Sequence, residues 1–208
     1  MNGIKDKIRE LNAYIRENFL KISIVLFVVF LLSSVLSYFF VLSFPQEKIV
    51  EVAGELETIF DVDNMMAKSG LSLFWAIFVN NLQAAGVSMV SAVIPVLFFP
   101  LWSVISNGII SGMVFAVGHH LGVENLFLLF LKVVLPHAIF EIPILILSNA
   151  IGLRFCILFI KKILGKAKGE SFRYHFDKAS EITFLYIIPL LLLAAFIEGV
   201  LEPLIFGI

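Results

Sequence analysis

The chain has 208 residues, of which 60% are hydrophobic and 22 are phenylalanine, and its mean hydropathy is +1.02. Several apolar runs reach the roughly 20 residues that a helix needs to cross a bilayer, which excludes a soluble globular protein and indicates an integral membrane protein. The single cysteine, Cys156, excludes an intramolecular disulfide, and the net charge of −1 points to no class of partner.

The charged residues are unevenly distributed along the chain. Residues 1–21 hold five Lys or Arg against three acids, and residues 161–178 hold six against two. Residues 45–70 reverse this balance, with six acids against two lysines. Because Lys and Arg in short loops mark the cytoplasmic side, we expect the N-terminus and the basic loop to be cytoplasmic and the acidic segment to be external.

The N-terminal residues 1–18 place four apolar residues at helical spacing among charges: Ile4, Ile8, Leu11 and Ile15. This pattern predicts an amphipathic helix on the inner membrane surface, or else a solvated extension of the first span. The first span is expected over Ile22–Phe44. It is too long for a typical signal peptide and lacks an Ala-x-Ala-like cleavage site, so we expect it to be retained.

The external segment, residues 45–70, carries apolar residues at helical spacing between its acids: Ile49, Val52, Leu56, Ile59 and Phe60. It predicts an amphipathic helix on the outer interface or a lid over the external face. Its acidic side is either simply solvated or a docking surface for a protein partner.

The second span begins at Leu71 and the third covers about residues 101–117. Both carry amide and small residues: Asn80, Asn81, Gln83, Gly86 and Ser88 on the second, and Asn107, Gly108, Ser111 and Gly112 on the third. Such residues within membrane helices usually mark close helix–helix contacts. These glycine-containing faces also suggest a homodimer.

The fourth apolar region, residues 125–163, contains Pro136 and Pro143, which we expect to interrupt its helix, so that it either crosses fully or folds back. A final span over about residues 182–201 then makes five crossings and places the C-terminus outside. The predicted fold class is all-α: a polytopic helical membrane protein with about five transmembrane helices and a proline-broken fourth region, forming one domain over residues 1–208.

Ionisable groups in hydrocarbon are costly, so a cluster of polar residues within the spans is a candidate site. It comprises Glu141, His137, Arg154, Asn80, Asn81, Asn149, Glu198 and Glu202. Glu141 has three possible roles: pairing with Arg154, His137 or the asparagine amides to lock a broken helix, carrying a proton or polar substrate, or binding a metal. The candidate metal ligands are His119, His120, His137 and Glu141.

Three blocks of sequence belong together in a known pattern: Phe78-Val-Asn80-Asn81, then Pro136-His137-x3-Glu141 with Gly152-Leu153-Arg154, and finally Pro189 to Pro203 with Glu198 and Glu202. They resemble the stage II sporulation protein M family. The resemblance implies a polytopic scaffold that holds peptidoglycan-degrading partners at the membrane. Ala138 and Phe155 depart from the family pattern without altering the charged positions.

We therefore expect a non-enzymatic membrane scaffold, with no cofactor, whose external acidic segment or outer turns bind proteins. The alternative is a transporter or lipid-handling protein that uses a buried Glu/His/Arg polar cavity. A third hypothesis, an intramembrane metal-dependent hydrolase, depends only on the presence of the histidines and Glu141. The expected partners are membrane lipids, a second copy of the chain and external proteins, but no nucleic acid.

Overall fold

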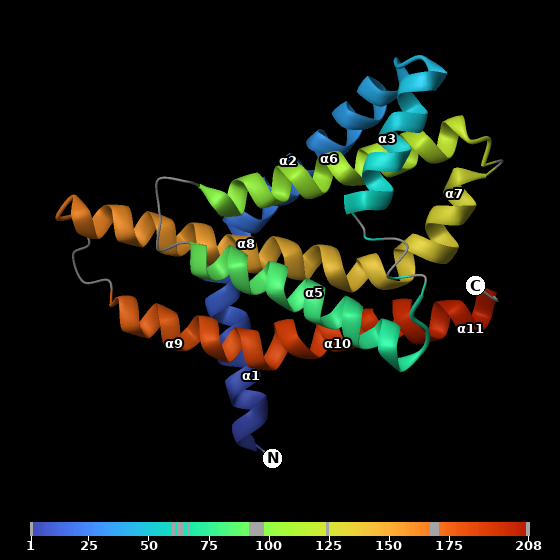
Figure 1. The fold of residues 1–208 in the computed structure, drawn as a ribbon. Coiled ribbons are helices and arrows are strands. Elements are labelled where there is room, and N and C mark those ends of the chain that lie inside the picture. Colours follow the sequence, from blue (N-terminus) through green and yellow to red (C-terminus); the bar gives the residue numbers. More distant parts are fainter. Residues whose placement is uncertain are drawn as a thin grey trace.

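The structure is a computed structural model that describes residues 2–59, 61, 65, 67–91, 98–123, 125–166 and 171–206. The elements in these ranges are all helical (Figure 1). The α-helices are α1 (Asn2–Asn18), α2 (Leu20–Leu42), α3 (Gln46–Ile59), α5 (Leu71–Val90), α6 (Phe99–His120), α7 (Leu126–Leu129), α8 (Leu135–Ile163), α9 (Phe172–Ile182), α10 (Ile188–Phe196) and α11 (Glu202–Phe206). Three π-helical turns join some of them: η3 (Phe130–Val134), η4 (Thr183–Ile187) and η5 (Ile197–Leu201).

Within the described ranges, five stretches are long and apolar enough to cross a bilayer, which confirms the predicted all-α, five-span fold class. Four are the single helices α2, α5, α6 and α8, and the fifth is the continuous run Phe172–Ile205 through α9, α10 and their π-helical turns. The α2 helix has one charged residue, Lys21 in its first turn, and the apolar run that follows is long enough to cross a bilayer.

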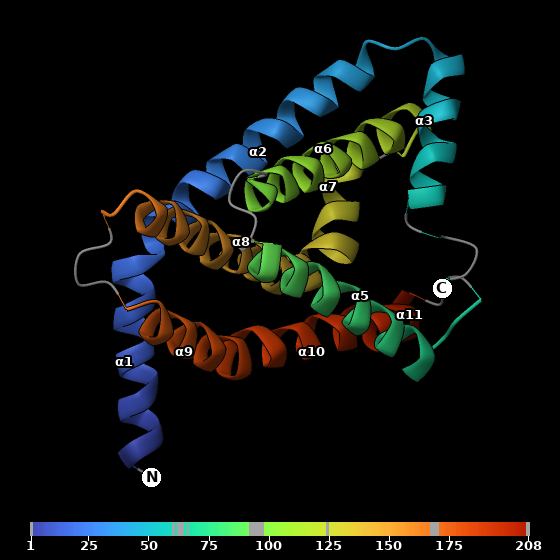
Figure 2. The ribbon, with the colours of Figure 1, turned by 60° about the vertical axis from the view of Figure 1, so that its left-hand side comes forward.

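The helices form two groups that diverge from one another. In Figure 2, α2 and α6 lie side by side as one arm, and α5, α8 and the α9–α10 run form a second group. The short α7 joins the arm to α8 (Figure 2). The two groups contact one another where α8 packs against α2 and α6.

Glycine allows the helices within each group to approach closely. A Cβ added at Gly112 of α6 would lie 2.1 Å from the Ser34 carbonyl oxygen of α2. In the other group, a Cβ at Gly152 of α8 would lie 2.2 Å from the Ser88 carbonyl oxygen of α5. The small-residue face of α6 is therefore used inside one chain, so it no longer argues for the predicted homodimer, which remains a proposal.

The fourth region changes its helical geometry next to Pro136, as expected, but the expected interruption at Pro143 is wrong. The α8 helix continues through Pro143, whereas the change in helical geometry lies in η3, just before Pro136. Proline fits the first turn of a helix because its missing N–H would have no intrahelical partner there. With 29 residues, α8 is about 44 Å long, enough for a complete crossing.

The α3 helix lies outside the spans and packs on α6. Its apolar residues Ile49, Val52 and Leu56 are buried against Val117, as the helical spacing predicted, while Ile59 is exposed. Phe60 lies outside the described residues. The four glutamates of α3 are exposed: Glu47, Glu51, Glu55 and Glu57.

The α1 helix bends away from α2 and docks on α9 (Figure 2). Leu11 and Tyr14 are buried, but Ile4 is 70% exposed, so only part of the predicted apolar face is used. The Tyr14 hydroxyl lies 2.5 Å from Nδ1 of His175. Burial raises the pKa of Tyr14 to about 12, so its phenol stays neutral.

Ion pairs complete this contact. Lys7 pairs with Glu181 of α9 at 2.6 Å, and Lys178 pairs with both Glu10 and Glu181. The hydrogen bond from Lys178 lowers the pKa of Glu10 below its ordinary value of 4.5. A carboxyl group whose pKa is lower in the docked state than in the undocked state stabilises docking at pH values above its ordinary pKa. This contribution is lost as the pH falls through the lowered pKa.

We expect α1 to be docked at neutral pH and to loosen below pH 4.5. Hydrogen–deuterium exchange of α1, corrected for intrinsic rates, should show protection that falls over this acidic range. Glu10→Gln should reduce the pH dependence, whereas Glu17→Gln, on an exposed position of the same helix, should keep it. Equal pH dependence in the two variants would contradict the role of Glu10.

Candidate functional site

A cavity of about 370 Å³ lies between the α2–α6 arm and the α5–α8 group. Its walls are largely apolar, but seven polar side chains from the described part of the chain line it: Asn81, Asn107, Ser111, His137, Glu141, Ser148 and Glu198. Pockets of this kind, apolar with a few converging polar groups, are typical binding sites. This cavity lies among the candidate membrane spans, where such groups are expensive.

His137 and Glu141 come from the first two turns of α8. They are one helical turn apart, so they share the face that looks into the cavity. His137 Nδ1 lies 3.0 Å from Oε1 of Glu202, and the Glu141 Oε1 accepts a hydrogen bond of 2.5 Å from Nδ2 of Asn81. A neighbour from another helix therefore holds each of these two side chains.

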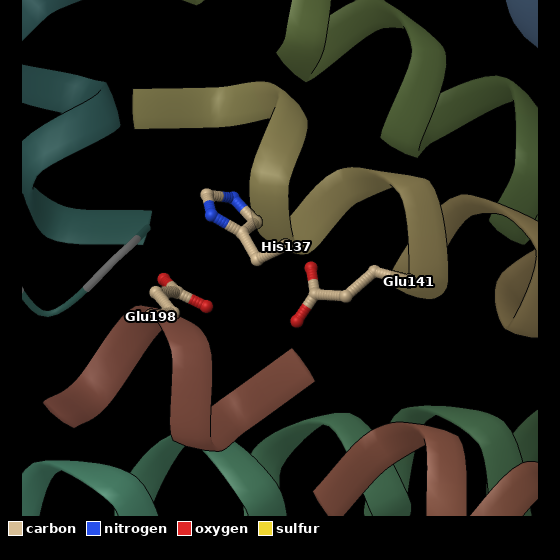
Figure 3. A group of neighbouring side chains, drawn as sticks. All are labelled: His137, Glu141 and Glu198. Atoms are coloured by element: carbon tan, nitrogen blue, oxygen red, sulfur yellow. The ribbon is translucent and has the colours of Figure 1, made fainter. Parts of the chain in front are cut away.

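Glu198 reaches the same point from η5 (Figure 3). A π-helical turn changes the register of the side chains that follow it, and such turns are frequent at functional sites. Gly199 lets η5 come close to α5, since a Cβ there would lie 2.7 Å from the Phe74 backbone nitrogen. The result is a three-residue cluster of His137, Glu141 and Glu198, whose ligand-type atoms all lie within 4.8 Å of one another.

The cluster carries an excess of potential negative charge. His137 and Glu202 both act electrostatically on Glu141 and on Glu198, and Glu141 also acts on Glu198. Three carboxyl groups thus surround one imidazole, and the Glu202 side chain is only 7% exposed. Such a group is stable in a membrane only if protons or a bound cation offset its charge.

The stage II sporulation protein M family model matches residues 26–203. The chain belongs to this family. The matched range contains every residue of the polar cluster predicted from the sequence, from Asn80 to Glu202. It also contains the five candidate spans except residues 20–25 of the first and residues 204–205 of the last. Comparison with curated proteins and with solved structures gave no match.

This family member does not bring all of its predicted site residues together. Arg154 lies 13 positions after Glu141 on the same helix, about 20 Å along its axis. Arg154 is close enough to Tyr14 to interact electrostatically with its phenol, so it lies at the α1 end of the molecule. Of the three predicted partners of Glu141, the structure therefore gives the hydrogen bond to an asparagine amide, that of Asn81, and not a pair with Arg154.

Four other predicted residues lie apart from the cluster. Asn80 is exposed, and the buried Asn149 donates from Nδ2 to the Leu145 carbonyl oxygen of its own helix at 2.7 Å. His119 lies 3.0 Å from the Tyr38 hydroxyl, and His120 lies 3.3 Å from the Ala116 carbonyl oxygen, both at the end of α6. Of the four candidate metal ligands, the structure groups His137 and Glu141, with Glu198 as the third member.

Two cavity residues were assigned from the sequence only to helix packing. Asn107 and Ser111 lie one turn apart on α6 and both line the cavity. Each also bonds within its own helix: Asn107 Nδ2 donates to the Ser103 carbonyl oxygen at 2.8 Å, and Ser111 Oγ donates to the Asn107 carbonyl oxygen at 2.8 Å. Polar residues that repeat at helical spacing on a membrane helix indicate either packing or a cavity wall, and the sequence does not distinguish the two.

Proposed function

We propose that this protein is a membrane transport protein that moves a small cation through the cavity between the α2–α6 arm and the α5–α8 group. The observation that carries the proposal is that Glu141, on a membrane-crossing helix, faces this cavity beside Glu198 and His137. A carboxylate in this position binds and releases protons or other cations, which is the usual role of acids in transporter spans.

Energetics also favour this role over a purely structural one. An ionisable residue costs about 2.5–3.5 kcal/mol at the centre of a membrane helix. Well-packed apolar residues commonly stabilise a buried position at least as well as an ion pair does. Two acids that line one cavity, Glu141 and Glu198, with a third, Glu202, bonded to His137 beside them, are therefore better explained by ligand binding than by helix packing.

Glu141→Gln tests the proposal because it removes the charge and keeps the size. In proteoliposomes with an imposed pH gradient and a trapped pH-sensitive dye, we expect the wild-type protein to carry proton flux. The variant should fall to the level of protein-free vesicles while keeping its elution profile in detergent. Glu51→Gln on the exposed face of α3 is the matched control and should keep wild-type flux. Absence of flux from the wild type would contradict the proposal.

A scaffold is the second candidate, favoured by α3. This helix is anchored on α6 by its apolar face and presents four exposed glutamates on the other, as a docking surface for a basic partner would. A scaffold would keep its partner in pull-downs after Glu141→Gln and lose it when the α3 glutamates are replaced by glutamine. Both proposals treat the protein as non-enzymatic and take the cytoplasmic N-terminus and external C-terminus predicted from its charges.

A further inference from the structure

We propose that the cavity binds a divalent first-row transition-metal ion through His137, Glu141 and Glu198. The inference rests on the proposed function, because it names the cation that the cavity takes. It depends on four observations: the closeness of the three donor groups, the neighbours that orient them, the excess of acidic groups, and the cavity beside them.

The donor groups are near the spacing that a metal requires. One donor atom from each of His137, Glu141 and Glu198 lies within 4.8 Å of the other two. Donors about 2.1 Å from a tetrahedral ion are about 3.4 Å apart. The three groups are therefore somewhat further apart than a bound ion would hold them, and binding would draw them together. Since Glu198 comes from a different span, the ion would join α8 to η5 (Figure 3).

The neighbours of these side chains resemble the outer shell of a metal site. A metal-binding histidine usually donates its other ring N–H to a carboxylate, which fixes the tautomer. The contact of 3.0 Å between Nδ1 of His137 and Glu202 has this form, and it leaves the Nε2 lone pair to bind a metal. Asn81 orients the Glu141 carboxylate in the same way.

Charge and ligand type select the ion. Three carboxyl groups with one imidazole leave a deficit of positive charge that a divalent cation offsets better than a single proton. Imidazole mixed with carboxylates suits zinc, manganese and iron, whereas magnesium and calcium prefer oxygen ligands alone. No cysteine ligand lies in the group, so a site that selects soft ions such as Cu(I) is not expected.

The cavity gives the ion a path and leaves coordination positions open. Its lining includes all three ligands together with the amide of Asn107 and the hydroxyl of Ser111. With three protein ligands, a tetrahedral ion keeps one position for water, unlike a structural metal site, whose four positions are all taken by protein. The site therefore fits a bound intermediate in transport.

Metal binding to the purified full-length protein tests the inference. After removal of metal with a chelator, the protein in detergent would be titrated with Mn²⁺ and with Zn²⁺ and followed by calorimetry and thermal unfolding. We expect one ion per chain with at least one of them, and a rise in unfolding temperature. Glu198→Gln should weaken binding more than about 100-fold, and Glu202→Gln, one shell further out, about 10- to 100-fold.

A matched control separates this site from adventitious binding. The double variant His119→Gln, His120→Gln removes the two imidazoles at the end of α6, outside the cluster, and should keep wild-type affinity. If wild-type protein binds neither ion in stoichiometric amount, or if the α6 variant loses the affinity and Glu198→Gln keeps it, the inference is wrong. Proton flux that persists without any metal binding would overturn the inference and leave the transport proposal standing.

Discussion

Replacing Gly152 with alanine is expected to destabilise the protein more than any other single added methyl group in the α5–α8 contact. The new Cβ would lie 2.2 Å from the Ser88 carbonyl oxygen and 2.9 Å from Pro100 Cγ. The first of these neighbours is backbone, so it cannot rotate away as a flexible side chain would. Overpacking of a tight core costs about 1–3 kcal/mol, and we expect the upper end of this range or more.

The measurement is the free energy of unfolding in mixed micelles, or the midpoint of thermal unfolding in detergent. Gly86→Ala is the matched control, because a Cβ at Gly86 on the partner helix α5 has nothing within 4 Å. This control should leave stability unchanged or raise it by up to about 1 kcal/mol, through the higher helix propensity of alanine. Similar unfolding midpoints for the two variants would mean that α5 and α8 do not pack as closely as described.

The number of spans could be predicted from the sequence because it depends on local composition. A run of about 20 apolar residues determines a crossing whatever lies next to it. The predicted first span, Ile22–Phe44, thus matches α2 to within two residues at each end. The bend before α2 could not be predicted in the same way, since it depends on the docking of α1 on a helix more than 150 positions later in the chain.

The sequence alone could not predict which helix packs against the glycines of α6. Gly108 and Gly112 indicate that a neighbour comes close, but a second copy of the chain satisfies that pattern as well as another helix does. The structure places α2 against both glycines, with the Phe30 carbonyl oxygen 2.6 Å from a Cβ added at Gly108. The prediction of a homodimer came from this ambiguity.

The polar cluster could be predicted in part. His137 and Glu141 are four residues apart, so any helix over these residues places them on the same face and close together. The expected break at Pro143 allowed Arg154 to fold back towards them, whereas the continuous helix keeps it about 20 Å away. Glu198 joins the cluster only through the path of η5 and its close approach at Gly199, which no local pattern reports.

Ala84→Trp is expected to abolish the proton flux measured in proteoliposomes while leaving the metal-binding residues intact. Ala84 lies on α5 one turn after Asn81, is exposed, and lines the cavity. An indole there would fill part of a space of about 370 Å³, while the donor residues His137, Glu141 and Glu198 themselves stay unchanged. Flux in proteoliposomes should fall to the level of protein-free vesicles, because the path for the cation is obstructed.

Equilibrium metal affinity should stay close to that of the wild type, since the ligands and the Glu202 contact are unchanged. Val79→Trp is the matched control: Val79 is 43% exposed, does not line the cavity, and lies about 140° around α5 from Ala84. It should keep both flux and affinity. Loss of affinity in Ala84→Trp would place the ion deeper in the cavity than the three ligands suggest, and unchanged flux would show that cations do not pass this way. Because binding and passage are measured separately, the pair of variants distinguishes a transport route from a site that only holds an ion.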